Sequence, residues 1–231
     1  MDSEHYKRLA ARAALELLPD AGVLGLGTGS TARYFIEGVA ELVRQGHRYT
    51  GVPTSEQSRE LAARLGIPLL DDEGPWEIAL SVDGADEVSP ELDLIKGGGG
   101  AHTREKIVNF AAQKNVIVVD ENKLSPKLGT RRSVPVEVLR FAHGETAHRL
   151  RTYGEVALRL AGGTPFCTDS GNYVYDVQTG PIDAPTKLDV ALKTLPGVVE
   201  TGLFCGRADV VLVAGTTGVR TLLAGARAPA R

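Results

Sequence analysis

The sequence predicts an α/β fold: a Rossmann-like parallel sheet with helices on both faces, plus an inserted small α+β ferredoxin-like domain. Between residues 21 and 119, short and wholly apolar segments alternate with amphipathic helical segments. That alternation is typical of parallel strands that are buried on both faces. Three polar clusters follow such segments, as ligand-binding groups do at the carboxyl edge of an open α/β sheet.

Each element of the first domain is predicted from its apolar spacing. The expected strands are 21–25, 49–52, 68–70, 78–82 and 116–119, and the expected helices are 4–18, one around 35–43, 54–65 and one capped by Thr103. This last helix is expected to bury Ile107, Phe110 and Ala111. Helices and strands that alternate in this way form a sheet covered on both sides.

The pattern changes after about residue 130. Expected strands at 133–139, 156–160, 165–168, 173–177 and 198–204 are joined by helices at 145–151 and 188–195. This order suggests a small split βαβ or ferredoxin-like domain. Because residues 209–214 read as another buried strand, we expect the first domain to comprise 1–130 and 206–231 and the insertion to comprise 131–205.

Composition excludes several classes of partner. The 231 residues are 42% hydrophobic and 24% charged, and a net charge of -3 gives no sign of a nucleic-acid partner. No apolar run spans a bilayer and the N-terminus has no signal-peptide core, so we expect no membrane association and a cytoplasmic location. Cys167 and Cys205 have no paired spacing, which suits a reducing compartment, and both are expected to be buried.

A glycine-rich turn, Gly25-Leu-Gly-Thr-Gly-Ser-Thr31, joins a strand to a helix. Its glycines let backbone approach a ligand, and the free N–H groups of the helix favour an anion such as phosphate. A dinucleotide fingerprint needs glycine where Ser30 stands and an acid after strand 49–52, and a Walker loop needs GxxxxGK; neither is present. The alternative is a helix cap with glycines that serve only packing.

A second cluster runs from residue 81 to 108 and carries acids, a cation and bare backbone. Asp83 and Asp86 end one strand, Lys96 precedes four glycines, and Glu105 lies near the start of a helix. Such a set suggests proton transfer on an anionic substrate. A surface turn followed by a flexible linker is the alternative.

These motifs, taken together, resemble type A ribose-5-phosphate isomerase. The segments GLGTGSTA, VDGADE, KGGGGAHTREKIV and PGVVETGLF occur in that family's order, over residues 7 to about 222. The resemblance implies reversible interconversion of D-ribose 5-phosphate and D-ribulose 5-phosphate in the pentose phosphate pathway. It also implies no metal and no other cofactor, a sugar phosphate as the small-molecule partner, and a homodimer or dimer of dimers.

The resemblance also implies roles for individual residues. Glu105 matches the general base, and Lys123 matches a substrate-binding lysine. The matching substrate loops are Thr28, Gly29, Ser30 and Thr31; Asp83, Gly84, Ala85 and Asp86; and Lys96, Gly97, Gly98 and Gly99. Lys7 stands at the position of an N-terminal lysine near the substrate. Gly100 and His102 depart from the familiar alanine and leucine, and a solvated or capping role is expected for His102.

Aldose–ketose isomerisation through an enediol moves one proton between adjacent carbons, so a single carboxylate serves both, and Glu105 is the expected base. Burial under substrate would raise the pKa of Glu105 and the helix N-terminus would lower it, and both outcomes stay open. Asp83 and Asp86 are expected to assist ring opening and to move hydroxyl protons. Lys96 and backbone N–H groups of the glycine run are expected to stabilise the enediolate oxygen.

Two other functions compete with isomerisation. A non-catalytic sugar-phosphate sensor would bind without turnover, but a sensor has no need of a C–H base. A phosphosugar deaminase or lactonase would need a different set of acids and histidines after the glycine run.

Overall fold

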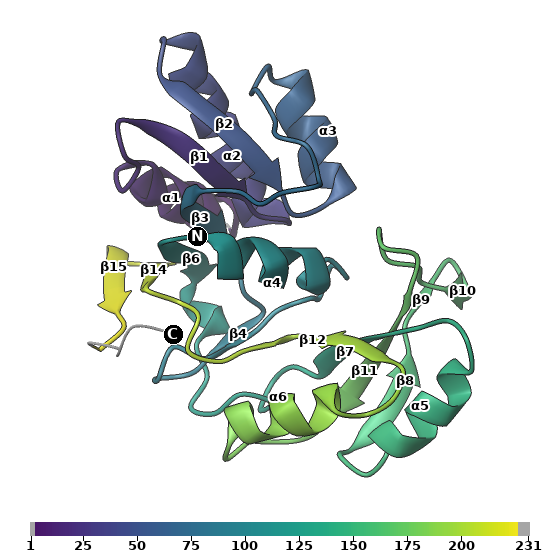
Figure 1. Ribbon diagram of the computed structural model, residues 1–231. Helices are drawn as coiled ribbons and strands as arrows, with labels where there is room; N and C mark the ends of the chain where they lie inside the picture. The colour runs from purple at the N-terminus through teal and green to yellow at the C-terminus, as the bar shows by residue number, and fades with distance from the viewer. Residues whose placement is uncertain (1–2, 226–231) are drawn as a thin grey trace. The chain divides into compact units, whose positions relative to one another are not determined.

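The computed structural model describes residues 3–225. The chain divides into two compact units. The first comprises Met1–Gly84, Val108–Asn122 and Gly206–Arg231, and the second comprises Ala85–Ile107 and Lys123–Cys205. Figure 1 traces both units along the chain.

A six-stranded sheet forms the centre of the first unit. Its order is β15-β14-β6-β3-β1-β2, and every neighbouring pair is parallel except the hairpin of β14 and β15. The strands are β1 (Ala21–Leu26), β2 (Arg48–Pro53), β3 (Ile78–Asp83), β6 (Asn115–Asp120), β14 (Val210–Gly215) and β15 (Gly218–Leu223). The predicted Rossmann-like sheet is therefore confirmed, with a hairpin at one edge that was not predicted.

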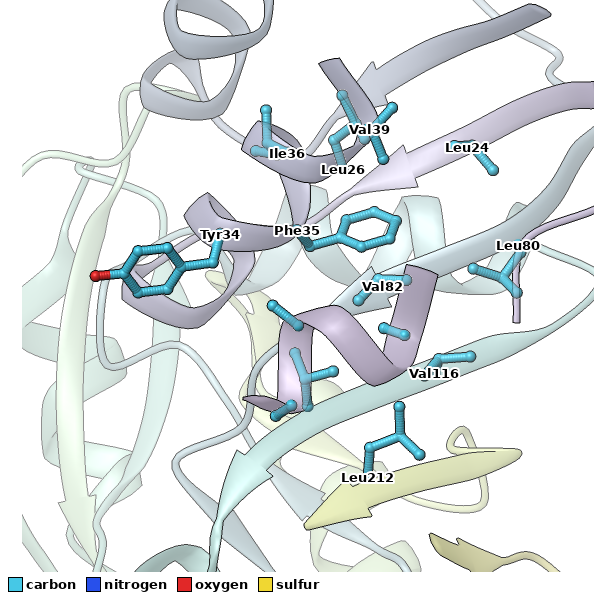
Figure 2. Close-up of a cluster of buried hydrophobic side chains, with 14 of the residues drawn as sticks. Leu24, Leu26, Tyr34, Phe35, Ile36, Val39, Leu80, Val82, Val116 and Leu212 are labelled. Atoms are coloured by element: carbon cyan, nitrogen blue, oxygen red, sulfur yellow. The ribbon is translucent and has the colours of Figure 1, made fainter. Parts of the chain in front are cut away.

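Helices cover both faces of this sheet. Helices α1 (Ser3–Leu15), α2 (Ser30–Arg44) and α3 (Glu56–Arg64) contribute to a core with β1, β3 and β6. Figure 2 shows Phe35 and Val39 of α2 in that core, beside Leu24, Leu80 and Val116 of the strands. On the other face, Val108 in the second half of α4 (His102–Ala111) packs with Val52 and Ile78. Removing these side chains from water is what drives the layers together.

The second unit contains an antiparallel sheet of order β12-β7-β11-β8. Its elements are β7 (Val134–Val138), α5 (His143–Leu150), β8 (Glu155–Leu158), β11 (Tyr173–Gln178), α6 (Pro185–Lys193) and β12 (Val198–Thr201). A βαββαβ chain whose last strand lies beside its first is the ferredoxin-like arrangement that was predicted. A small hairpin, β9 (Leu160–Ala161) with β10 (Thr164–Pro165), extends from β8.

The division of the chain differs from the predicted one. Residues 85–107 and 123–130 belong with the insertion rather than with the parallel sheet. The cause is a third sheet, in which β5 (Leu94–Ile95) pairs with both β4 (Glu87–Val88) and β13 (Leu203–Phe204). The buried Glu87 carboxylate also accepts hydrogen bonds from the N–H groups of Gly129 and Arg131, at 2.9 and 3.1 Å.

Three local predictions were wrong. Residues 68–70 form one bridge to Gly51 rather than a strand, because the chain turns away at Asp71, whose carboxylate accepts the Glu73 N–H. Cys167 is exposed beside the small hairpin and Cys205 is only partly buried. Ile107 and Phe110 are 55% and 62% exposed, because α4 buries a largely polar face instead.

Candidate active site

The turn that follows β1 is held by a network of hydroxyl groups. Thr28 Oγ1 lies 2.7 Å from Thr54 Oγ1 and 2.8 Å from Ser55 Oγ, and the Ser58 hydroxyl donates to the Gly27 carbonyl at 2.7 Å. Thr54, Ser55 and Ser58 stand at the end of β2 and the start of α3, and the sequence alone did not single them out. Their signal was a run of hydroxyl residues after a predicted strand.

Asp83 ties this turn to the neighbouring strand. One carboxylate oxygen, Oδ1, accepts the N–H of Thr28 at 3.0 Å and the N–H of Gly84 at 2.8 Å. A Cβ on Gly27 would lie 2.4 Å from that carboxylate, so only glycine fits there. Asp83 is 7% exposed, and its two hydrogen bonds order the turn.

Gly29 and Ser30 open onto a pocket of about 520 Å³ in the first unit. Gly29 precedes α2 with a φ of 101°, in the left-handed region that favours glycine. Arg33 and Arg64 line the pocket together with Glu4 and Glu60. The N-terminus of a fifteen-residue helix suits an anion such as phosphate, whereas the charge of Arg33 is partly balanced by Glu4 at 3.6 Å.

Lys96 and Glu105 form a buried ion pair in the second unit. Lys96 Nζ lies 3.1 Å from Glu105 Oε2, and the two residues are 3% and 6% exposed. Lys96 directly follows β5, where its N–H donates to the Gly202 carbonyl at 2.9 Å, and Glu105 lies in the first turn of α4. Each group supplies the opposite charge that its buried partner requires.

The glycine run forms a tight turn beside Asp86. The Gly98 N–H donates to Asp86 Oδ2 at 2.7 Å, and the Gly100 N–H donates to the Gly97 carbonyl at 2.9 Å. A side chain does not fit at position 98, because a Cβ on Gly98 would lie 2.8 Å from the Asp86 carboxylate. The N–H groups of Gly98 and Gly100 already donate hydrogen bonds within the turn. The expectation that the whole glycine run stabilises an oxyanion therefore does not extend to these two groups.

The structure brings some predicted residues together and gives others a different setting. Thr28 contacts Asp83, Gly98 contacts Asp86, and Lys96 pairs with Glu105. Lys7 donates to Glu4 Oε1 at 2.6 Å, within α1. Lys123 ends the 3-10 turn Glu121–Lys123 and is partly buried.

His102 is wholly buried, so the expected solvated or capping role was wrong. Its ring lies against the glycine run, so close that a Cβ added to Gly97 would be 2.6 Å from His102 Nδ1. Burial, followed by the positive charges of Lys106 and Arg159, lowers the pKa of His102 to about 3, with Glu200 acting in the opposite direction. The imidazole is therefore neutral in the folded chain at neutral pH.

Burial of a neutral histidine predicts a specific loss of stability in acid. Between pH 6.5 and 3 the unfolded chain binds a proton that folded His102 rejects, so the free energy of unfolding falls by about 1.4 kcal/mol per pH unit as pH drops. We expect His102→Leu to remove this slope, measured as the difference in urea-unfolding free energy from the parent at pH 7 and pH 5. His148→Leu, at an exposed position of α5, is the control. A His102→Leu protein as acid-sensitive as the parent would contradict the assignment.

Within residues 3–225, no cluster of three or more His, Cys, Asp or Glu side chains is arranged to hold a metal ion. In the same range, no helix has the length and apolar character needed to cross a membrane.

Comparisons with known proteins place this chain in one family. A family model described as ribose 5-phosphate isomerase A (phosphoriboisomerase A) matches residues 50–218. The ribose-5-phosphate isomerase A of Gloeobacter violaceus is 46% identical over 224 residues, which cover 96% of this chain and 97% of the relative. That of Chloroflexus aurantiacus is 46% identical over 222 residues, covering 94% of this chain and 93% of the relative.

Solved structures agree with the sequence matches. A D-ribose-5-phosphate isomerase in complex with phospho-erythronic acid superposes with a TM-score of 0.93 at 39% identity, covering 96% of this chain and 100% of that one. The ribose 5-phosphate isomerase A of Methanocaldococcus jannaschii gives a TM-score of 0.91 at 40% identity, with the same coverage. The turn after β1, the paired aspartates, the glycine run and Glu105 thus occur in a chain that belongs to the ribose 5-phosphate isomerase A family.

Proposed function

We propose that Glu105 is the base with which this chain interconverts D-ribose 5-phosphate and D-ribulose 5-phosphate. The observation that carries the proposal is the buried pair of Lys96 and Glu105, 3.1 Å apart, at the end of the glycine run. The Lys96 ammonium group supplies a countercharge to that carboxylate, and both side chains are shielded from water. Both properties serve a group that must remove a proton from carbon.

The proposed reaction begins with opening of the sugar ring, assisted by Asp83 and Asp86. Glu105 then takes the proton from C2 of the aldose, and the electron pair moves to form the C1–C2 enediolate. Lys96, whose ammonium group has three N–H donors, stabilises the negative oxygen. Glu105 returns the proton to C1, and a hydroxyl proton moves between the two oxygens to complete the ketose.

Substrate binding is assigned to three loops. Thr28, Gly29, Ser30 and Thr31 hold the phosphate, supported by the pocket at Gly29 and Ser30 and by the N-terminus of α2. The segments Asp83–Asp86 and Lys96–Gly99, with Lys123, contact the sugar. No cofactor enters the proposal. A homodimer or dimer of dimers in the cytoplasm is proposed as the working form, and light scattering of the purified chain measures its mass.

The test is ketose formation from ribose 5-phosphate in the presence of EDTA, with phospho-erythronic acid as inhibitor. We expect turnover to survive EDTA, because the proposed steps use side chains alone. Phospho-erythronic acid should inhibit with a Ki below the KM of ribose 5-phosphate, since its carboxylate carries two oxygens in one plane, as the enediolate does. Erythronic acid, which lacks the phosphate, is the matched ligand and should bind more weakly.

Two outcomes would contradict the proposal. Binding of ribose 5-phosphate without turnover would favour the sugar-phosphate sensor, and loss of turnover in EDTA would require a metal. The sensor is not favoured, because the chain keeps the carboxylates and the lysine that a C–H proton transfer needs and belongs to a family of isomerases.

A further inference from the structure

Arg159, in the segment between β8 and β9, reaches the glycine run from within the second unit. Its Nη1 donates to the carbonyl oxygen of Gly97 at 2.7 Å and to that of Gly98 at 3.2 Å. Arg159 lies outside the sequence motifs that indicate function, and 61 residues separate it from Gly98 in the chain. Within this unit, Arg159 therefore joins the stretch 131–205 to the loop that follows Lys96.

The guanidinium group is itself held in one orientation by Asp176. Arg159 Nε donates to Asp176 Oδ2 at 3.0 Å and Nη2 donates to Asp176 Oδ1 at 2.5 Å, and the two side chains are 15% and 27% exposed. Asp176 lies in β11 with neighbours on both sides, so its backbone is fixed by the sheet. Only arginine presents such a planar fork to a carboxylate and keeps a further N–H for a carbonyl.

Arg159 and Asp86 hold the two ends of one peptide unit. The carbonyl of Gly97 and the N–H of Gly98 belong to the same peptide bond, and a trans peptide directs these groups to opposite sides. Arg159 binds the carbonyl end, and the Asp86 carboxylate binds the N–H end at 2.7 Å. Held at both ends, the Gly97–Gly98 peptide cannot rotate without breaking a charge-assisted hydrogen bond.

This restraint is needed because the loop has no side chains of its own to order it. Glycine has the widest conformational freedom of any residue, and Gly97 adopts a φ of 100°. The peptide directly follows Lys96, and the same hydrogen bond positions the carboxylate of Asp86. A rotation of this peptide would therefore displace two groups proposed to act on the substrate.

We propose that Arg159, oriented by Asp176, is a positioning residue that holds the Gly97–Gly98 peptide, and with it Lys96 and Asp86, in the arrangement that isomerisation requires. This inference rests on the proposed function. It assigns a part in the reaction to residues 131–205, a stretch that contains none of the proposed proton-transfer groups.

The test compares Arg159→Lys and Asp176→Asn with the parent and with Arg149→Lys, a control at an exposed position of α5. Lysine keeps the charge but cannot bind both oxygens of Asp176 and the Gly97 carbonyl. We expect kcat to fall about 10- to 100-fold, with KM changed much less, because a small misplacement of catalytic groups acts mainly on the transition state. The Ki of phospho-erythronic acid should rise by a similar factor, since it presents the geometry of the enediolate.

The inhibitor separates positioning from mere loss of folded protein. A purely structural role would lower the active fraction, and so the apparent kcat, while Ki and KM stayed at the parent values. That result, or an Arg159→Lys protein with parental kcat and Ki, would overturn the inference. If Arg159→Lys does not fold, the kcat, KM and Ki of Asp176→Asn test the inference in the same way. A parent without turnover would overturn the proposed function itself, whereas an active parent with unaffected variants overturns only this inference.

Discussion

Replacing Glu105 with glutamine is expected to lower the kcat of ribose 5-phosphate isomerisation by about 10³-fold or more, equivalent to about 4 kcal/mol in the barrier. The amide has nearly the shape of the carboxylate but cannot accept a proton from carbon. Glu105 is 6% exposed and lies 3.1 Å from Lys96, so the variant also loses the charge that the lysine faces. Steady-state assays of the parent and the variant in EDTA measure the effect.

A first-turn glutamate can also serve only to complement the helix dipole. Glu145 lies in the first turn of α5 and is exposed, so Glu145→Gln is a matched change at a comparable backbone position. We expect this control to keep the parental kcat. Equal, small losses in both variants would mean that Glu105 contributes to its helix and not to the reaction.

Isotope exchange shows which step is lost. In D₂O the parent should place deuterium on the carbon that receives the proton, because the base exchanges with solvent during the reaction. Glu105→Gln should lose this incorporation together with turnover. Retained exchange with slow ketose formation would assign the C–H step to another group and leave ring opening or hydroxyl proton transfer to Glu105.

The fold was predictable because several strands of its parallel sheet are almost wholly apolar. Residues 78–82 and 116–119 have almost no polar side chains and lie between helical segments. This combination is typical of a parallel sheet that helices cover on both faces. The edge strand β15 was missed for the opposite reason. It mixes exposed residues such as Arg220 with partly buried ones and follows a two-residue turn. Such a segment carries little apolar signal of its own.

Helix α4 shows where periodicity misleads. Its apolar residues Ile107 and Phe110 predicted the buried face, yet they are exposed, while His102, Glu105 and Lys106 are buried. Periodicity predicted the helix correctly but not its buried face. That face is set by polar contacts with residues distant in the chain, such as the contact of Lys106 with Glu200. A local rule that fails in this way is expected where residues serve a site rather than a core.

The candidate site was predictable only in its local parts. Asp83, Lys96 and Glu105 stand in compact motifs whose residue types suggest their chemistry. Arg159 and Asp176 carry no such motif, because their contacts with the glycine run join distant parts of the chain. Positioning residues of this kind follow from the fold and not from local spacing.

The buried cation Lys106 predicts the largest effect on stability. Its Nζ lies 2.7 Å from Glu200 Oε1 and 3.6 Å from Asp189 Oδ1, with the Phe204 ring centroid at 5.0 Å. Burial alone would raise the pKa of Glu200, but the charge and hydrogen bonds of Lys106, with a contribution from Lys193, bring it below its ordinary value. Glu200 is therefore a partly buried anion that Lys106 and Lys193 both stabilise.

We expect Lys106→Met to lower the free energy of unfolding by about 3–5 kcal/mol, measured by urea denaturation followed by circular dichroism. Methionine has a similar length but leaves Glu200 and Asp189 without their central partner. Most of this cost is the penalty for partly buried carboxylates that have lost their nearest countercharge, although Glu200 keeps the Lys193 ammonium group at 2.8 Å. Adding Glu200→Gln to Lys106→Met should therefore recover much of the loss, as a double-mutant cycle would show.

Lys127 supplies the control, because its ion pair with Asp183 is even shorter, at 2.5 Å, but the side chains are 55% and 84% exposed. We expect Lys127→Met to leave the urea midpoint close to that of the parent, since exposed pairs are weakened by solvent and salt. The two variants thus test whether the burial of an ion pair or the distance between its charged atoms decides its effect on stability. If Lys127→Met cost as much as Lys106→Met, or if Glu200→Gln deepened the loss in the Lys106→Met background, the lost countercharge would not be the cause. The free energy would then have to come from the packing of the Lys106 side chain against Phe204.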